Sequence, residues 1–242
     1  MAAHGPLAGL KVIELAHIMA GPICGLMLAD MGADVIKIEK VPDGDDTRRM
    51  VPPTVDGESA AFMILNRNKR GVALNLKSPG GKAVLEKMLA TADVVIENYR
   101  PGTMERFGLG YETLHKMNPA LIYCQVTGFG RTGPYANRAG FDLIAQGLSG
   151  IMSVTGEGAG RQPVKAGPPI TDISAGFLAA MGVLAAYVHR LKTGEGQLVD
   201  TSLLEAGVTT TYWQSAICLA TGKSPGAIGS AHPLSAPYQA IQ

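Results

Sequence analysis

Short β-rich runs alternate with helical segments over most of this chain. Residues 11–15 and 34–39 are β-rich, and residues 22–31 between them read as a helix with Pro22 near its start and Gly32 as its stop. Such a β-α-β opening predicts a parallel strand pair with a right-handed crossover. Four further β-rich runs continue the alternation, at residues 71–76, 93–97, 121–127 and 197–201. The pattern predicts an α/β fold with a doubly wound, mostly parallel sheet.

The first strand–helix turn lacks the usual nucleotide-binding glycines. It reads AHIMAGP, and neither GxGxxG nor GxxxxGK[ST] occurs there. We therefore expect a Rossmann-like sheet without the Rossmann pyrophosphate turn.

Charge and cysteine usage exclude several classes of protein. The 21 basic and 20 acidic residues nearly balance, which argues against a nucleic-acid or anionic-membrane surface. The cysteines Cys24, Cys124 and Cys218 form no CxxC or metal-ligand spacing, so we expect no metal site and buried thiols in a reducing compartment. The start lacks a signal-peptide pattern, and the apolar run at residues 177–188 looks too short to span a bilayer. A cytoplasmic location follows as an expectation.

Polar groups stand just after several predicted strands. They are His17, Lys40, Asn75 with Lys77, Asn98 with Arg100, and the glycine-rich loop 128–140. Because ligands of parallel sheets bind beyond the carboxyl ends of the strands, these groups predict a site for an anion-bearing ligand. Each also has a local explanation, as a turn hydrogen bond or a solvated surface lysine.

Asp172 stands where a Pro/Gly-rich loop becomes a long apolar helix, predicted at residues 173–190. One interpretation is an N-cap, whose side chain accepts from the free N–H groups of the first turn. The other is a catalytic carboxylate. Spacing alone leaves both open.

Several longer segments resemble one enzyme family. They include LAGLKVIELAHIMAGP, LADMGADVIKIE, GDDTR, NRNKRGVALNLKSPGGK, ADVVIENYRPGTMERFGLGYE and GPPITDISAGFLAAMGVLAA, in order along the chain. In these segments the chain resembles the class III CoA-transferases, the group of formyl-CoA transferase, carnitine CoA-transferase and alpha-methylacyl-CoA racemase.

The resemblance implies that Asp172 is a nucleophile. It would attack an acyl-CoA thioester to give a mixed anhydride and then an aspartyl-CoA thioester, which a carboxylic acid acceptor attacks in turn. CoA would be a substrate, with no permanently bound cofactor. The resemblance also implies that CoA contacts come from residues His17, Ile18, Met19, Ala20, Lys40, Leu74, Asn75, Leu76, Lys77, Asn98, Tyr99, Arg100, Arg106, Arg138, Ala139, Gly140 and Phe141.

Some residues depart from the family patterns. Met19, Lys40 and Ala139 replace a glutamine, an arginine and a lysine of formyl-CoA transferase, which puts formyl or oxalyl specificity in doubt. Racemases of the family carry a GHD triplet, whereas this chain has Phe141 in the middle position. Racemisation needs a base on each face of the α-carbon, and phenylalanine supplies none, so a transferase is favoured over a racemase. His115 and His189 are expected on helices elsewhere.

The resemblance further implies a domain organisation. We expect a large CoA-binding domain over residues 1–201, a linker helix over 202–224, and the truncated beginning of a small domain over 225–242. Family members form interlocked homodimers, and a chain without the small domain is expected to be poorly active. A non-catalytic CoA-binding protein is the third alternative, less favoured because Asp172 is present.

Overall fold

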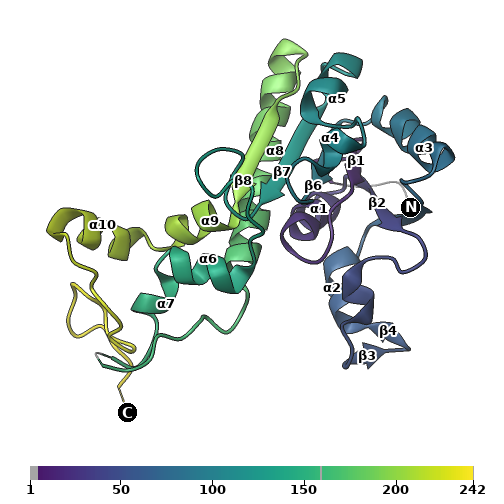
Figure 1. The fold of residues 1–242 in the computed structure, drawn as a ribbon. Helices are drawn as coiled ribbons and strands as arrows, with labels where there is room; N and C mark the ends of the chain where they lie inside the picture. Colours follow the sequence, from purple (N-terminus) through teal and green to yellow (C-terminus); the bar gives the residue numbers. More distant parts are fainter. Residues whose placement is uncertain (1–4, 159, 242) are drawn as a thin grey trace.

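The computed structural model describes residues 5–158 and 160–241. It contains a six-stranded parallel sheet (Figure 1). In chain order, its strands are β1 (Lys11–Glu14), β2 (Asp34–Lys40), β5 (Arg70–Leu74), β6 (Val94–Glu97), β7 (Ile122–Thr127) and β8 (Leu198–Ser202). The main helices are α1 (Ala20–Asp30), α3 (Pro79–Leu89), α4 (Thr103–Arg106), α5 (Tyr111–Met117), α6 (Asp142–Leu148), α7 (Ile151–Val154) and α8 (Ile170–Thr193).

The strands lie side by side in the order β5-β2-β1-β6-β7-β8, and every pair in this sheet is parallel. By order of appearance along the chain this is the doubly wound arrangement in which the winding reverses between β1 and β6. The predicted fold class is confirmed.

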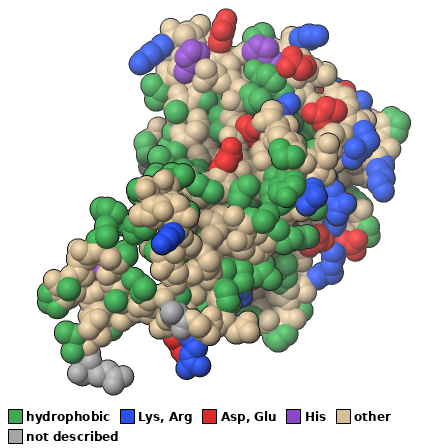
Figure 2. All heavy atoms as spheres, turned by 60° about the vertical axis from the view of Figure 1, so that its left-hand side comes forward, with side chains coloured by type: hydrophobic (Ala, Val, Ile, Leu, Met, Phe, Trp, Pro, Cys, Tyr) green, Lys and Arg blue, Asp and Glu red, His purple; other side chains and the backbone are tan. Residues whose placement is uncertain are grey.

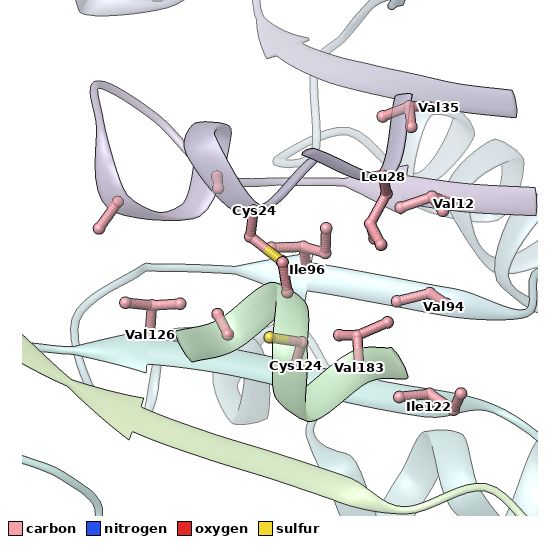
Figure 3. Packing of buried hydrophobic residues seen from close by; sticks show 14 of the residues in the cluster. Val12, Cys24, Leu28, Val35, Val94, Ile96, Ile122, Cys124, Val126 and Val183 are labelled. Atoms are coloured by element: carbon pink, nitrogen blue, oxygen red, sulfur yellow. The ribbon is translucent and has the colours of Figure 1, made fainter. Parts of the chain in front are cut away.

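Helices cover both faces of the sheet because its strands are apolar on both sides. On one face, Val12 and Cys124 pack with Cys24 of α1 and Val183 of α8 in one core (Figure 3). On the other face, Tyr123 and its neighbours pack against α3, α4 and α5 in a second core. Gly176 brings α8 close to α1, since a Cβ there would lie 2.6 Å from the side chain of Ile23.

The long polar connection between β2 and β5 has its own local structure. It contains the 3-10 helix η1 (Asp46–Arg49), the hairpin β3 (Thr54–Val55) and β4 (Glu58–Ser59), and helix α2 (Ala60–Asn66). The connection places Asp45 and η1 beside the carboxyl end of β1, where the candidate site lies.

Two expectations for the last third of the chain were wrong. The helix expected from residue 202 is two helices, α9 (Leu203–Thr210) and α10 (Tyr212–Thr221), interrupted at Thr211. Cys218 is exposed on α10, whereas Cys24 and Cys124 are buried as expected. The predicted domain division stays a prediction. Residues 1–4 and 159 of the first predicted unit and residue 242 of the last lie outside the described residues.

Helix α8 is longer than the sequence suggested. With 24 residues and a window of mean hydropathy 1.5, it is long and apolar enough by composition to cross a membrane. One face of it belongs to the core, where Ala175, Ala179 and Val183 are fully buried, while Met181 and Leu191 on the helix are exposed.

Candidate active site

The site begins where the sheet reverses its winding, between the carboxyl ends of β1 and β6. The backbone N–H of His17 donates to Oδ1 of Asn98 at 2.8 Å, and Nδ2 of Asn98 donates back to the carbonyl of His17 at 2.8 Å. This two-bond clamp joins the ends of the two strands. Crevices at such switch points are where ligands of doubly wound sheets bind.

A cavity of about 420 Å³ opens at this point. Most of the residues predicted for the site line it. They are His17, Ile18, Met19, Ala20, Asn98, Tyr99, Arg100, Arg138, Ala139, Gly140, Phe141 and Asp172. Segments separated by more than a hundred residues are thus brought together as the sequence predicted.

The other predicted contacts lie along the same sheet edge, outside this cavity. Lys40 ends β2 and pairs in register with Leu74 at the end of β5. Nζ of Lys40 contacts Oδ1 of Asp46 at 2.7 Å, and Asp46 lines the cavity. Four other predicted contacts lie outside the cavity: Asn75, Leu76 and Lys77 follow β5, and the exposed Arg106 is on α4. A ligand reaching all of these residues would have to extend along the edge from β6 towards β5.

Asp172 does not cap its helix. Helix α8 begins at Ile170, with Pro169 as the N-cap residue, so Asp172 lies in the first turn. The N-cap interpretation, one of the two left open by the sequence, was wrong, as was the expected helix start at residue 173. The acceptor for the first turn of α8 comes instead from another helix. Oδ1 of Asp142, on α6, accepts from the backbone N–H of Thr171 at 2.9 Å and from the Thr171 hydroxyl at 2.7 Å.

Because Asp142 is the acceptor for the first turn of α8, Asp172 does not serve as one, and Asp172 lines the cavity instead. Within residues 5–158 and 160–241, no donor hydrogen-bonds it. Burial raises the pKa of Asp172 to about 7, and the nearby negative charge of Asp142 adds to the effect. A carboxylate with a pKa near neutrality is a stronger base and nucleophile, once ionised, than an ordinary aspartate.

Cations face the cavity without a carboxylate partner. Among the ion pairs of the described residues, none involves Arg100 or Arg138. The side chain of Arg138 instead lies over the ring of Tyr135, with its guanidinium carbon 4.2 Å from the ring centroid. The N-terminal end of α1 also reaches the cavity through Met19 and Ala20. Arginine and a helix N-terminus are the usual protein groups for binding phosphate.

Of His17, His115 and His189, only His17 lines the cavity that Asp172 lines. Phe141 stands at the cavity, where a family racemase would place a histidine, and His115 and His189 do not line it. His17 does line it, with Nε2 3.3 Å from the hydroxyl of Tyr99. Burial and the charge of Lys37 lower its pKa, so it is neutral at pH 7.

Sequence reasoning missed three acidic residues of the site. Asp142 orients the start of α8, Asp46 lines the cavity, and Asp45 is fully buried behind it. The segment GDDTR, which carried part of the resemblance, was the signal for the last two. No group of three or more His, Cys, Asp or Glu residues in the described part of the chain could hold a metal ion.

The family follows from comparison with known proteins. The family model for CoA-transferase family III matches residues 7–242. The chain belongs to CoA-transferase family III. Over 98% of its length it is 48% identical to a succinate–glutarate CoA-transferase of Agrobacterium fabrum and 40% identical to a human succinyl-CoA:glutarate CoA-transferase. A crystal structure of a CAIB/BAIF family protein from Brucella suis superposes with a TM-score of 0.93 at 46% identity over 98% of this chain. The predicted family is confirmed.

The chain is shorter than these family members. It spans 60% of the Agrobacterium enzyme, 54% of the human enzyme and 64% of the Brucella chain.

Proposed function

We propose that the protein carrying this chain transfers CoA from an acyl-CoA to a carboxylic acid, with Asp172 as the acyl acceptor. The observation that carries the proposal is the position of Asp172. Its carboxylate stands in the first turn of α8, at a cavity also lined by Arg100 and Arg138, which form no ion pair with any described residue. The chain that holds it belongs to the CoA-transferase family.

The proposed reaction uses the carboxylate in two stages. Ionised Asp172 attacks the thioester carbonyl, the C–S bond breaks, and CoA leaves as a thiolate. The thiolate then attacks the Asp172 carbonyl of the mixed anhydride, releasing the first carboxylic acid and leaving an aspartyl-CoA thioester. The acceptor carboxylate attacks the carbonyl of this thioester, its C–S bond breaks, and CoA leaves again as a thiolate, which gives a second anhydride. CoA thiolate opens that anhydride at the acceptor's carbonyl, which regenerates Asp172.

Short dicarboxylic acids are the substrates we propose. The relatives named above act on succinate or succinyl-CoA with glutarate, and another, 42% identical, is an acetyl-CoA:oxalate CoA-transferase of Acetobacter aceti. A dicarboxylate keeps one charged carboxylate while the other reacts, and that remaining charge needs a cation. Arg138 lines the cavity close to Phe141 in sequence and has no carboxylate partner among the described residues, so it is suited to this contact.

Trapping with hydroxylamine tests the proposal. The purified protein is incubated with succinyl-CoA, glutaryl-CoA or acetyl-CoA and then with hydroxylamine, and its peptides are analysed by mass spectrometry. A hydroxamate at Asp172 supports acyl transfer. An unmodified Asp172, together with deuterium entering the α-carbon of a 2-methylacyl-CoA, would favour the racemase alternative, with His17 as the available second base.

Homodimerisation is part of the proposal. Large apolar side chains are exposed on α6, α8 and α10, including Leu148, Met181 and Leu219, and hydrophobic side chains are spread over the face in Figure 2. Such faces are usually covered in the assembled protein. A mass near twice that of the chain in light scattering would support the dimer, and a monomer would contradict it. We also propose a cytoplasmic location, which fractionation of the source cells would test.

A further inference from the structure

The turn between β1 and α1 has a backbone shape that its own sequence disfavours. Ile18 has a φ of 66°, in the left-handed region where β-branched residues are rare. Ile18 and its neighbours His17 and Met19 all line the cavity. Contacts from outside the turn must therefore stabilise this conformation.

Those contacts come from a buried carboxylate of the β2–β5 connection. The backbone N–H of Ile18 points between the two oxygens of Asp45, at 3.3 Å from each. Nζ of Lys37, on β2, contacts Oδ2 of Asp45 at 2.8 Å and donates to the carbonyl of Ala16 at 2.8 Å. One ion pair thus holds polar backbone groups on both sides of His17.

Asp45 is itself firmly fixed. Its side chain is fully buried, and its Oδ1 accepts from the backbone N–H of Thr47 at 2.9 Å and from the Thr47 hydroxyl at 2.8 Å. Burial alone would raise the pKa of Asp45, but the charge and hydrogen bond of Lys37, with the bonds from Thr47, hold it at about 2. The carboxylate is therefore ionised across the physiological pH range.

The ion pair continues under the turn as a chain of buried charges. Nζ of Lys37 contacts Oε1 of Glu14 at 2.9 Å, and Oε2 of Glu14 contacts Nζ of Lys69 at 2.8 Å. Nζ of Lys69 donates to the carbonyl of Pro22, in the first turn of α1, at 2.8 Å. Gly25 makes room for this chain, because a Cβ there would lie 1.9 Å from Oε2 of Glu14. The charges alternate in sign and anchor the start of α1 as well as the turn before it.

We infer that Asp45 is a positioning residue for the CoA thioester: by holding Ile18 in the left-handed conformation, it aims the turn of residues 17–20 into the cavity. The inference rests on the proposed function, since it takes the ligand to be a CoA thioester. The competing interpretation is a buried ion pair that serves stability alone. If Asp45 positions the turn, the affinity for CoA depends on how readily residue 18 adopts a positive φ. If the ion pair serves stability alone, the affinity does not depend on residue 18 in this way.

Binding of CoA, measured by titration calorimetry on the whole protein, separates the two interpretations. Asp45→Asn keeps the size of the side chain and removes the charge, so we expect the Kd for CoA to rise by about 10- to 100-fold, as for a lost charge-assisted hydrogen bond. Glycine adopts positive φ freely, so adding Ile18→Gly to Asp45→Asn should recover at least about threefold of the lost affinity. Restoring affinity by changing residue 18 is a result that a purely structural ion pair does not produce.

Two controls accompany this comparison. Glu112→Gln removes an exposed charge on α5, which does not line the cavity, and it should bind CoA within about threefold of wild type. Asp172→Asn should also bind CoA yet form no hydroxamate. If wild type itself fails to bind CoA, the proposed function fails.

The positioning role is overturned by either of two results in folded protein, as judged by circular dichroism. One is a Kd for Asp45→Asn within threefold of wild type, and the other is a double variant that binds no better than Asp45→Asn. Should Asp45→Asn not fold, Lys37→Gln combined with Asp45→Asn removes both charges of the pair, and the same comparison with Ile18→Gly is made in that background.

Discussion

Replacing Asp172 by asparagine should stabilise the folded protein, and more so at high pH. Asparagine keeps the shape of the side chain but cannot ionise. The wild-type carboxyl has a pKa raised from an ordinary 3.8 to about 7 by burial and by the charge of Asp142. Ionising it in the folded state therefore carries a free-energy cost that the unfolded chain does not have.

The two pKa values set both the size of this free-energy cost and the pH range over which it develops. One pKa unit is worth about 1.4 kcal/mol, so the full cost is at most about 4 kcal/mol. Between pH 3.8 and about 7 the folded state retains a proton that the unfolded state has lost, so wild-type stability falls as pH rises through this window. Above it both states are ionised, and no further loss occurs. Because the carboxylate faces a cavity open to solvent, part of the cost is screened.

Urea unfolding of both proteins at about pH 5 and about pH 8.5 measures the effect. We expect the stability advantage of Asp172→Asn to grow by about 1–3 kcal/mol between these pH values. The exposed Glu112 on α5 provides the matched control, since Glu112→Gln should change stability by less than about 0.5 kcal/mol at either pH. An advantage that stays constant or shrinks as pH rises would refute the desolvation of Asp172.

Three further predictions concern packing, affinity and rate. Gly176→Ala should lower the unfolding free energy by about 1–3 kcal/mol in denaturant titration, because its Cβ would lie 2.6 Å from Ile23 on α1. Arg100→Gln should raise the Kd for CoA by about tenfold or more in calorimetry, because it removes a cation at the cavity. Asp142→Asn should shift the rise of acyl transfer rate, expected near pH 7 in wild type, to lower pH in a rate–pH profile, because it removes the negative charge that helps to raise the pKa of Asp172.

Each of these has a control and a contradicting result. Gly80→Ala, in open space on α3, should leave the protein as stable or more stable, and an equal loss in both glycine variants would remove the packing explanation. Arg161→Gln, on an exposed loop, should bind CoA normally, and equal losses in both arginine variants would point to a general charge effect. An unchanged rate–pH profile in Asp142→Asn would mean that Asp142 does not influence the reacting carboxylate.

Periodicity predicted the sheet well because each strand is short, apolar and bounded by turn residues. It could not reveal the buried ion chain. Glu14 and Lys37 stand in runs that read as alternating strands, where a charged residue normally marks a solvated face. Helices cover both faces of this sheet, so these side chains are buried and must pair with partners distant in sequence.

The same limit applies to the site. The strand-end groups could be predicted because parallel strands end at one edge, and this brought His17 and Asn98 together correctly. The N-cap interpretation of Asp172 was wrong because the side chain that accepts from the first turn of α8 belongs to Asp142 on another helix. Asp142 lies thirty residues earlier in the chain, and no local pattern links the two.

Isotope transfer to Asp172 tests the central claim most directly. The protein is turned over with an acyl-CoA donor and an acceptor dicarboxylate labelled with ¹⁸O in its carboxylates, and the peptide containing Asp172 is analysed by mass spectrometry. In the proposed route an acceptor oxygen remains on Asp172 when CoA opens the second anhydride, so the label should accumulate at that residue. Continued CoA transfer with no ¹⁸O on Asp172 would show that its carboxylate does not take part covalently.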